Sequence, residues 1–216
     1  MLLAVVLMKI TDVTPQKKNK NRVSVFVDGE YSFSLDGADA LRLGVKTGAE
    51  ISEKDIEIYN LESNLSKAKA KAFDIVARKM VTERELRTKL ADKGYDKIIC
   101  DIVIETMRDY NYINDADYCV SFFEYAASKG WGQMKIRAEL KRRGVQDSTV
   151  SQAMADFEDC PEKRIYDILC RKFENVDFKD YKQKQKVVRF FASRGFDFDS
   201  IQSAVSRFVS EKGEDV

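Results

Sequence analysis

Apolar residues recur every three or four positions along most of this chain, which is the spacing of amphipathic helices. When Gly94, Gly144 and Gly195 are aligned, two apolar residues one turn apart coincide, a cation precedes the glycine and a bulky apolar residue follows it. The three stretches are TERELRTKLADKGY at 82–95, SKGWGQMKIRAELKRRGV at 128–145 and QKQKVVRFFASRGF at 183–196. Such a period is typical of tandem arrays, whose units bury hydrophobic faces against their neighbours.

The periodicity predicts three helices in each of three units, joined by short connections that favour compact packing. The nine helices are expected at residues 66–80, 82–93, 97–110, 114–129, 132–143, 147–157, 161–174, 180–194 and 197–211. A further helical stretch opens at Ser52, with Asp55 at its third position. Polar caps and a first-turn proline mark other starts: Thr82 with Glu85, Asn114 with Asp117, Asp197 with Ser200, and Pro161.

The N-terminal part has a different pattern, with alternating apolar and polar residues from Met8 to Leu35. KITDV is a candidate strand, followed by a basic loop. RVSVFVDGEYSFSL predicts a hairpin around the Asp28-Gly29 turn. A short helix is expected at residues 38–43. The apolar stretch from Leu2 to Leu7 is too short to span a membrane and lacks the features of a signal peptide, and Met8 is an alternative start.

These elements predict a mainly α protein. We expect a tandem array of three three-helix units, elongated and curved, preceded by a small β-hairpin/α module. The expected domains are the N-terminal module at residues 1–60 and three-helix units at 61–113, 114–159 and 160–216.

The composition argues against several classes of enzyme. The chain has no histidine, so it lacks the usual general base, the Ser–His and Cys–His nucleophile systems and the commonest zinc ligand. Asp109, Asp115 and Asp117 have no second acidic cluster near them, and helix capping explains Asp117 better than a metal does. We therefore expect no enzymatic activity, no cofactor and no metal.

The four cysteines form no C-x-x-C pair, and we expect buried free thiols in a reducing, cytoplasmic setting. They are Cys100, Cys119, Cys160 and Cys170. Aromatic residues at helical spacing, such as Tyr118 with Phe122 and Phe123, and Phe190 with Phe191, are expected in the core.

Charge is nearly balanced overall, with 37 Lys and Arg against 36 Asp and Glu, but one stretch is strongly basic. Between residues 129 and 143, Glu139 is the one acid. Cations at a helix C-terminus are explained by the helix dipole alone. The excess before that turn favours a surface for a polyanion or an acidic partner. The candidate contacts here are Lys129, Lys135, Arg137, Lys141, Arg142 and Arg143.

Trp131, the one tryptophan, forms a second apolar strip with Met134 and Ala138, opposite Ile136 and Leu140. A helix that is apolar on both sides is either sandwiched between neighbouring units or presents an anchor to a partner. Trp131 is therefore a candidate contact as well as a candidate packing residue.

The other basic residues divide less clearly, and those at positions 171, 172, 182, 184, 186 and 189 are expected to be more exposed and carry one sign of charge. Those around residues 78–93 alternate with acids and resemble i,i+4 pairs on a solvated surface. The loop at 17–22 is equally consistent with an ordinary solvated turn. These further candidate contacts are Arg78, Arg87, Lys93, Arg171, Lys172, Lys182, Lys184, Lys186, Arg189, Lys17, Lys18, Lys20 and Arg22.

The order of these motifs resembles the RecX family of regulatory proteins. The resemblance rests on K-N-R at 20–22 with V-S-V-F-V-D-G-E-Y at 23–31. It also rests on T-x-x-E-L-x-x-K-L-x-x-K-G-Y at 82–95 and G-x-x-K-I-x-x-E-L-x-x-R-G-V at 132–145. It spans Met8 to Val209. The third unit departs most, with Phe191 where the others have leucine.

The resemblance implies a non-enzymatic, cytoplasmic protein that lodges in the groove of RecA–DNA filaments and inhibits strand exchange and ATP turnover. It also implies possible contact with single- or double-stranded DNA. We expect no membrane and no small-molecule substrate. The alternative is a sequence-nonspecific DNA-binding protein that acts through its basic helices without RecA. The sequence leaves open inhibition or stimulation, DNA preference, oligomeric state and which basic residues share a face.

Overall fold

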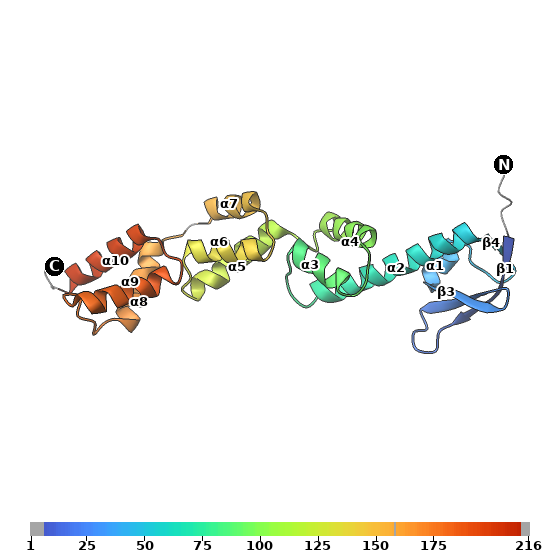
Figure 1. Cartoon of the computed structure of the whole chain (residues 1–216), viewed down its shortest axis with the longest axis horizontal. Coiled ribbons are helices and arrows are strands. Elements are labelled where there is room, and N and C mark those ends of the chain that lie inside the picture. The colour runs from blue at the N-terminus through green and yellow to red at the C-terminus, as the bar shows by residue number, and fades with distance from the viewer. Residues whose placement is uncertain (1–6, 158, 213–216) are drawn as a thin grey trace. The chain divides into compact units, whose positions relative to one another are not determined.

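The computed structural model describes residues 7–157 and 159–212, so most of the apolar stretch from Leu2 to Leu7 lies outside the described residues. Helices dominate these residues, and the strands are confined to the N-terminal part (Figure 1). The expected mainly α class, with a small strand module before three three-helix domains, is confirmed.

The strand module is a four-stranded antiparallel sheet in the order β3-β2-β1-β4. Asp28 and Gly29 both have positive φ, 50° and 91°, which is the type I′ geometry expected of this hairpin. Sequence analysis missed β4, because three residues are too few to show an alternating pattern. The strands are β1 (Leu7–Pro15), β2 (Arg22–Val27), β3 (Glu30–Asp36) and β4 (Glu50–Ser52).

Two helices complete this part of the chain, α1 (Gly37–Arg42) and α2 (Glu53–Val76). Ser52 and Asp55 form the expected capping box at the start of α2. The helix packs against β3 and then continues, without a break, into the first three-helix domain, where it packs against α4 (Lys97–Asp109). It ends at Val76, four residues earlier than expected. The domain boundaries given above remain a prediction.

Arg22 lies in the sheet rather than in the loop before it. Its guanidinium donates to the carbonyl oxygen and Oγ of Ser34, at 3.0 and 3.2 Å, and to Oγ of Ser63 in α2 at 2.8 Å. Both serines are buried. Arg22 therefore ties the sheet to α2, and its role is structural in this setting.

Each of the nine expected helices exists, with ends that differ by a few residues, except that the first is the C-terminal part of the longer α2. The expected caps at Asn114 and Asp197 form, and Pro161 occupies the first turn of its helix. The remaining helices are α3 (Glu83–Ala91), α5 (Asp115–Ser128), α6 (Gln133–Arg142), α7 (Asp147–Ala155), α8 (Pro161–Lys172), α9 (Tyr181–Ala192) and α10 (Phe198–Glu211).

The aligned apolar pairs of the three repeats are all buried, which explains the repeating pattern. Their side chains retain at most 1% of their exposure, and those of the second and third domains belong to separate clusters. Each middle helix therefore packs the same two positions into its own domain. The pairs are Leu86 and Leu90, Ile136 and Leu140, and Val187 and Phe191.

The aromatic prediction is confirmed for Tyr118, Phe122, Phe123 and Phe191, which are buried, whereas Phe190 is half-buried. The cysteine prediction is wrong for half of its residues. All four thiols are free, and Cys100 and Cys119 are buried. Cys160 and Cys170 are exposed. Cys160 precedes Pro161 in a connection, and Cys170 lies on the solvent face of α8.

The chain divides into two compact units. One contains the residues up to 79 together with 86–112, and the other contains 80–85 together with those from 113 onwards. The second and third three-helix domains therefore lie in one unit, with the residues that begin α3.

Candidate functional site

The basic helix α6 has less free charge than its sequence suggests. Glu139 accepts hydrogen bonds from Arg142, at 2.7 and 2.8 Å, and from Arg143 at 2.9 Å. These bonds hold the pKa of Glu139 at about 2, and the bond from Arg142 has the largest effect. Partial burial of the carboxylate opposes the shift. One acid therefore serves two of the predicted contact residues.

Arg143 and Arg137 are also engaged within the second domain. The Arg143 guanidinium bonds to the Tyr118 hydroxyl and lies 4.6 Å from the ring centroid of Phe122. Arg137 donates to Oγ of Ser151 at 3.1 Å and lies 3.6 Å from a carboxylate oxygen of Asp147. Of the α6 cations, Lys135 and Lys141 have no ion pair among the described residues.

Trp131 is half-buried and packs against the core of its own second domain. Its ring meets Phe122 edge-on, with 6.2 Å between centroids, and the Nζ of Lys135 lies 4.3 Å from its centroid. Its carbonyl oxygen accepts a hydrogen bond from Arg164 of α8 at 2.8 Å. The rest of the predicted strip is different, because Met134 is 64% exposed.

The start of α6 docks on the third domain through backbone groups. The Gly132 N–H donates to the Arg194 carbonyl at 2.8 Å, and the Met134 N–H donates to the Gly195 carbonyl at 3.0 Å. Gly195 has a φ of 81°, and a Cβ there would overlap the backbone N of Lys135. Gly195 is thus needed both for the helix end and for the close approach of the second domain.

A related contact, made by side chains rather than backbone, occurs one repeat earlier within the same compact unit. The Thr82 hydroxyl, at the position aligned with Gly132, donates to the Arg143 carbonyl at 2.8 Å. The Arg84 side chain covers Gly144, whose φ is 88°. By contrast, Gly94 has a φ of 86° and nothing within 4 Å of a Cβ position. The repeated glycine therefore ends a helix in all three domains, and at Gly144 and Gly195 residues from an earlier part of the chain also approach it closely.

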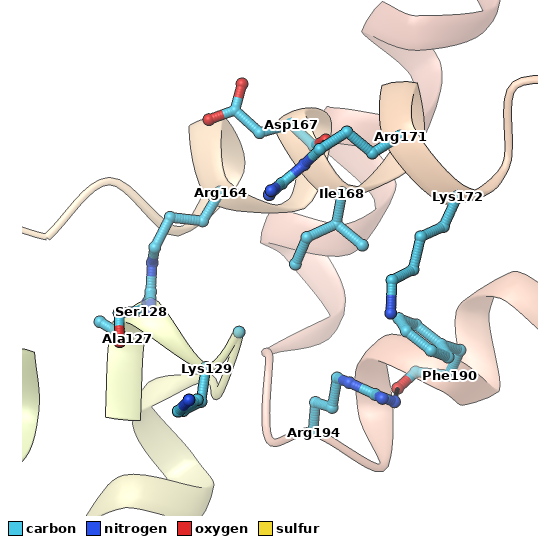
Figure 2. A pocket seen from close by; sticks show the side chains of 11 residues that line it. Ala127, Ser128, Lys129, Arg164, Asp167, Ile168, Arg171, Lys172, Phe190 and Arg194 are labelled. Atoms are coloured by element: carbon cyan, nitrogen blue, oxygen red, sulfur yellow. Dashed lines mark hydrogen bonds between the residues drawn. The ribbon is translucent and has the colours of Figure 1, made fainter. Parts of the chain in front are cut away.

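A cationic pocket lies beside this docking contact (Figure 2). Its volume is about 490 Å³, and it is lined by the C-terminal ends of α5 and α9 and by α8. We call it the junction pocket. Asp167 is its one acidic lining residue, and its five cationic lining residues are Lys129, Arg164, Arg171, Lys172 and Arg194.

Arg164 is a structural member of the junction pocket. Its guanidinium pairs with the nearly buried carboxylate of Asp159 at 2.7 Å and also bonds to the Trp131 carbonyl. Its Nε is buried and has no partner among the described residues. Arg164 therefore joins α8 to the second domain and is not free to neutralise a ligand.

The other four cations have no carboxylate partner among the described residues. Arg171 donates through Nε to the Asp167 carbonyl at 3.0 Å, which leaves its terminal nitrogens open. Arg194 stacks on Phe190, 3.5 Å from the ring centroid, and the Nζ of Lys172 lies 5.9 Å from the same ring (Figure 2). Lys129 reaches the pocket from the second domain.

Sequence reasoning named Lys129, Arg171 and Lys172 but did not connect them, and it missed Arg164 and Arg194 as pocket residues. A signal for Arg194 existed, since it is the cation before the third aligned glycine. Nothing in the local sequence marks Arg164.

The remaining α9 candidates lie outside the junction pocket. Three are exposed and Lys184 is half-buried, and none has an ion pair among the described residues. They are Lys182, Lys184, Lys186 and Arg189.

In the N-terminal compact unit the candidates are dispersed. Arg87 pairs with Asp101. Arg78 lines a second cavity of about 290 Å³, where Asp74 is the one acid. Lys93 is exposed, as are the loop residues Lys17, Lys18 and Lys20.

Within residues 7–157 and 159–212, no helix is long and apolar enough to cross a membrane. The same residues contain no group of three side chains suited to hold a metal ion.

The strand module, the three similar helical domains and the cationic junction define a tandem helical-repeat protein. Four family models match it in order. They are the regulatory protein RecX N-terminal domain at residues 8–52 and the first, second and third three-helix domains of RecX at 68–107, 114–154 and 162–205. The chain therefore belongs to the RecX family of regulatory proteins.

Individual relatives agree with this assignment. The regulatory protein RecX of Clostridium perfringens (strain 13 / Type A) is 30% identical over 94% of this chain and 98% of its own length. That of Clostridium beijerinckii is 28% identical over 96% and 99%. A crystal structure of regulatory protein RecX has a TM-score of 0.73 at 22% identity, covering 92% of this chain and 99% of that one, which shows the fold.

Proposed function

We propose that this protein binds RecA recombinase filaments in the cytoplasm and inhibits their ATPase and strand-exchange activities. The observation that carries the proposal is the match to RecX over both the strand module and all three helical domains, in order. RecA modulation is the role known for that family. The protein acts by binding and needs no catalytic residue of its own.

The docking contacts support a physical mechanism. Backbone hydrogen bonds from Gly132 and Met134 hold the second domain on the third, so their surfaces are presented together. Each domain then adds a modest contact with the filament, and the covalent linkage multiplies their effect through a high effective concentration. A protein seated in this way blocks the space that a second DNA duplex requires and restrains the protomer motions that accompany ATP turnover.

The test measures ATP hydrolysis by RecA on single-stranded DNA while the protein is added. We expect the rate to fall as the protein approaches the RecA concentration. The variant Lys135→Gln/Lys141→Gln removes two cations of α6 without ion pairs. At about 0.5 kcal/mol for each unpaired charge, it is expected to raise the half-inhibitory concentration roughly fivefold.

The matched control is Lys163→Gln/Lys179→Gln, which removes the same charge from two exposed positions of the third domain. It is expected to inhibit like the unmodified protein. An unchanged ATPase rate at stoichiometric excess contradicts the proposal. If the protein binds naked DNA and leaves RecA unaffected, the alternative of a DNA-binding protein without a RecA partner replaces it.

A further inference from the structure

We propose that the junction pocket binds one or two phosphates of a single-stranded nucleic acid, and that this ligand ties the second and third three-helix domains together. The proposal goes beyond RecA binding and is tested without RecA. The cations that it uses come from both sides of the junction: Lys129 from the second domain, and Arg171, Lys172 and Arg194 from the third.

The first argument is the charge balance of the junction pocket. The four cations without a carboxylate partner among the described residues lie at or near the C-terminal ends of α5, α8 and α9, where helix dipoles favour positive charge. Three such ends supply roughly −1.5 charges. Together with Asp167 they leave about +1.5 of the four positive charges uncompensated. That excess matches one or two phosphodiester groups.

The second argument is the geometry of the donors. The Nε of Arg171 is used on a backbone carbonyl, so the side chain is oriented while its terminal nitrogens stay free. Arg194 is held flat on Phe190. Oriented guanidinium groups match the oxygen geometry of phosphate better than mobile ammonium groups do.

The third argument is the size and polarity of the junction pocket. A volume of about 490 Å³ exceeds the need of a single ion. Its wall includes Ile168, Ala127 and the ring of Phe190 beside the cations. An apolar surface next to cations suits a nucleotide unit, whose phosphate and unstacked base need different surroundings. A single-stranded segment therefore fits better than an inorganic anion.

The ligand also has an expected effect on the protein. Without an anion, Lys129 repels the cations of the third domain across the junction. A bound phosphate removes this repulsion and attracts both sides. The docking hydrogen bonds donated by Gly132 and Met134 should then open less often.

Fluorescence anisotropy with a labelled eight-nucleotide oligo(dT) tests the site. We expect Arg171→Gln/Lys172→Gln to weaken binding at least tenfold, while the control Lys163→Gln/Lys179→Gln weakens it less than threefold. The slope of log K against log salt concentration should fall by about 0.7 for each phosphate that the variant no longer neutralises. Equal weakening by both variants overturns the site, because it means diffuse attraction, and so does the absence of binding at low salt.

Two further measurements complete the test. Amide hydrogen exchange at Gly132 and Met134 should slow severalfold when the oligonucleotide saturates the protein, and unchanged exchange overturns the bridging role. A glutamate octapeptide should not compete. Pocket-dependent binding of that peptide instead assigns the pocket to an acidic protein segment and overturns the proposal. RecA inhibition by a protein that binds no oligonucleotide rejects this inference and leaves the proposed function intact.

Discussion

Replacing Gly195 by alanine tests the docking of the second three-helix domain on the third, and Gly94→Ala is its matched control. Both glycines follow a helix end at nearly the same φ, 81° and 86°. An alanine in that region costs about 1 kcal/mol in either place. The difference lies in the surroundings, because a Cβ at Gly94 meets nothing within 4 Å.

At Gly195 the new Cβ would overlap the backbone N of Lys135 and lie 2.9 Å from its Cα. Backbone cannot move aside as the end of a long side chain can, so the start of α6 must withdraw. The hydrogen bonds donated by Gly132 and Met134 then break, at about 1 kcal/mol each. Gly195→Ala is therefore expected to cost about 3 kcal/mol, against about 1 kcal/mol for Gly94→Ala.

Urea denaturation of both variants measures the free energy of unfolding. Amide hydrogen exchange at Gly132 and Met134 reports whether the junction has opened. We expect fast exchange at both amides in Gly195→Ala and native exchange in Gly94→Ala. Equal destabilisation by the two substitutions, within about 0.5 kcal/mol, refutes the reasoning, since the docking contact would then add nothing to the strain.

Two other predictions concern titratable groups. In the native protein a thiol reagent should react quickly with Cys160 and Cys170 only. The other two thiols are protected because burial raises the pKa of Cys119 to about 11 and also raises that of Cys100. Fast reaction of all four thiols contradicts the described burial. The pKa of Glu139 falls from 4.5 to about 2 on folding, so its contribution is present above pH 4.5 and lost as the pH drops towards 2. After allowance for screening this is about 1–2 kcal/mol, and Glu139→Gln should lack this part of the acid sensitivity in pH-dependent unfolding.

Periodicity predicted the helices well because each helix has its own buried stripe. Leu86 and Leu90, one turn apart, are fully buried at the positions that the repeat indicated. The errors have local causes. Strand β4 contains three residues, and its pairing with β1 depends on a partner far away in the sequence. The thiol of Cys170 lies on the solvent face of a helix whose pattern alone suggested burial.

The candidate site was predicted less completely. A basic α6 could be read from the sequence, but the use of Arg143 within its own domain could not. Arg143 contacts Tyr118 and Phe122, which lie on another helix. The junction pocket likewise combines Lys129 with Arg194, residues separated by 65 positions in the chain. Such combinations depend on which domain surfaces meet.

The sequence by itself determined the helices, the repeat and the family, because these depend on local spacing and on patterns within each domain. Only the tertiary structure decided what the repeated glycine does, since Gly94 and Gly195 have the same backbone conformation and differ only in what approaches them. It also decided which cations are free. A charge is compensated by whatever lies within a few ångströms, and that distance is set by packing between helices rather than by order along the chain.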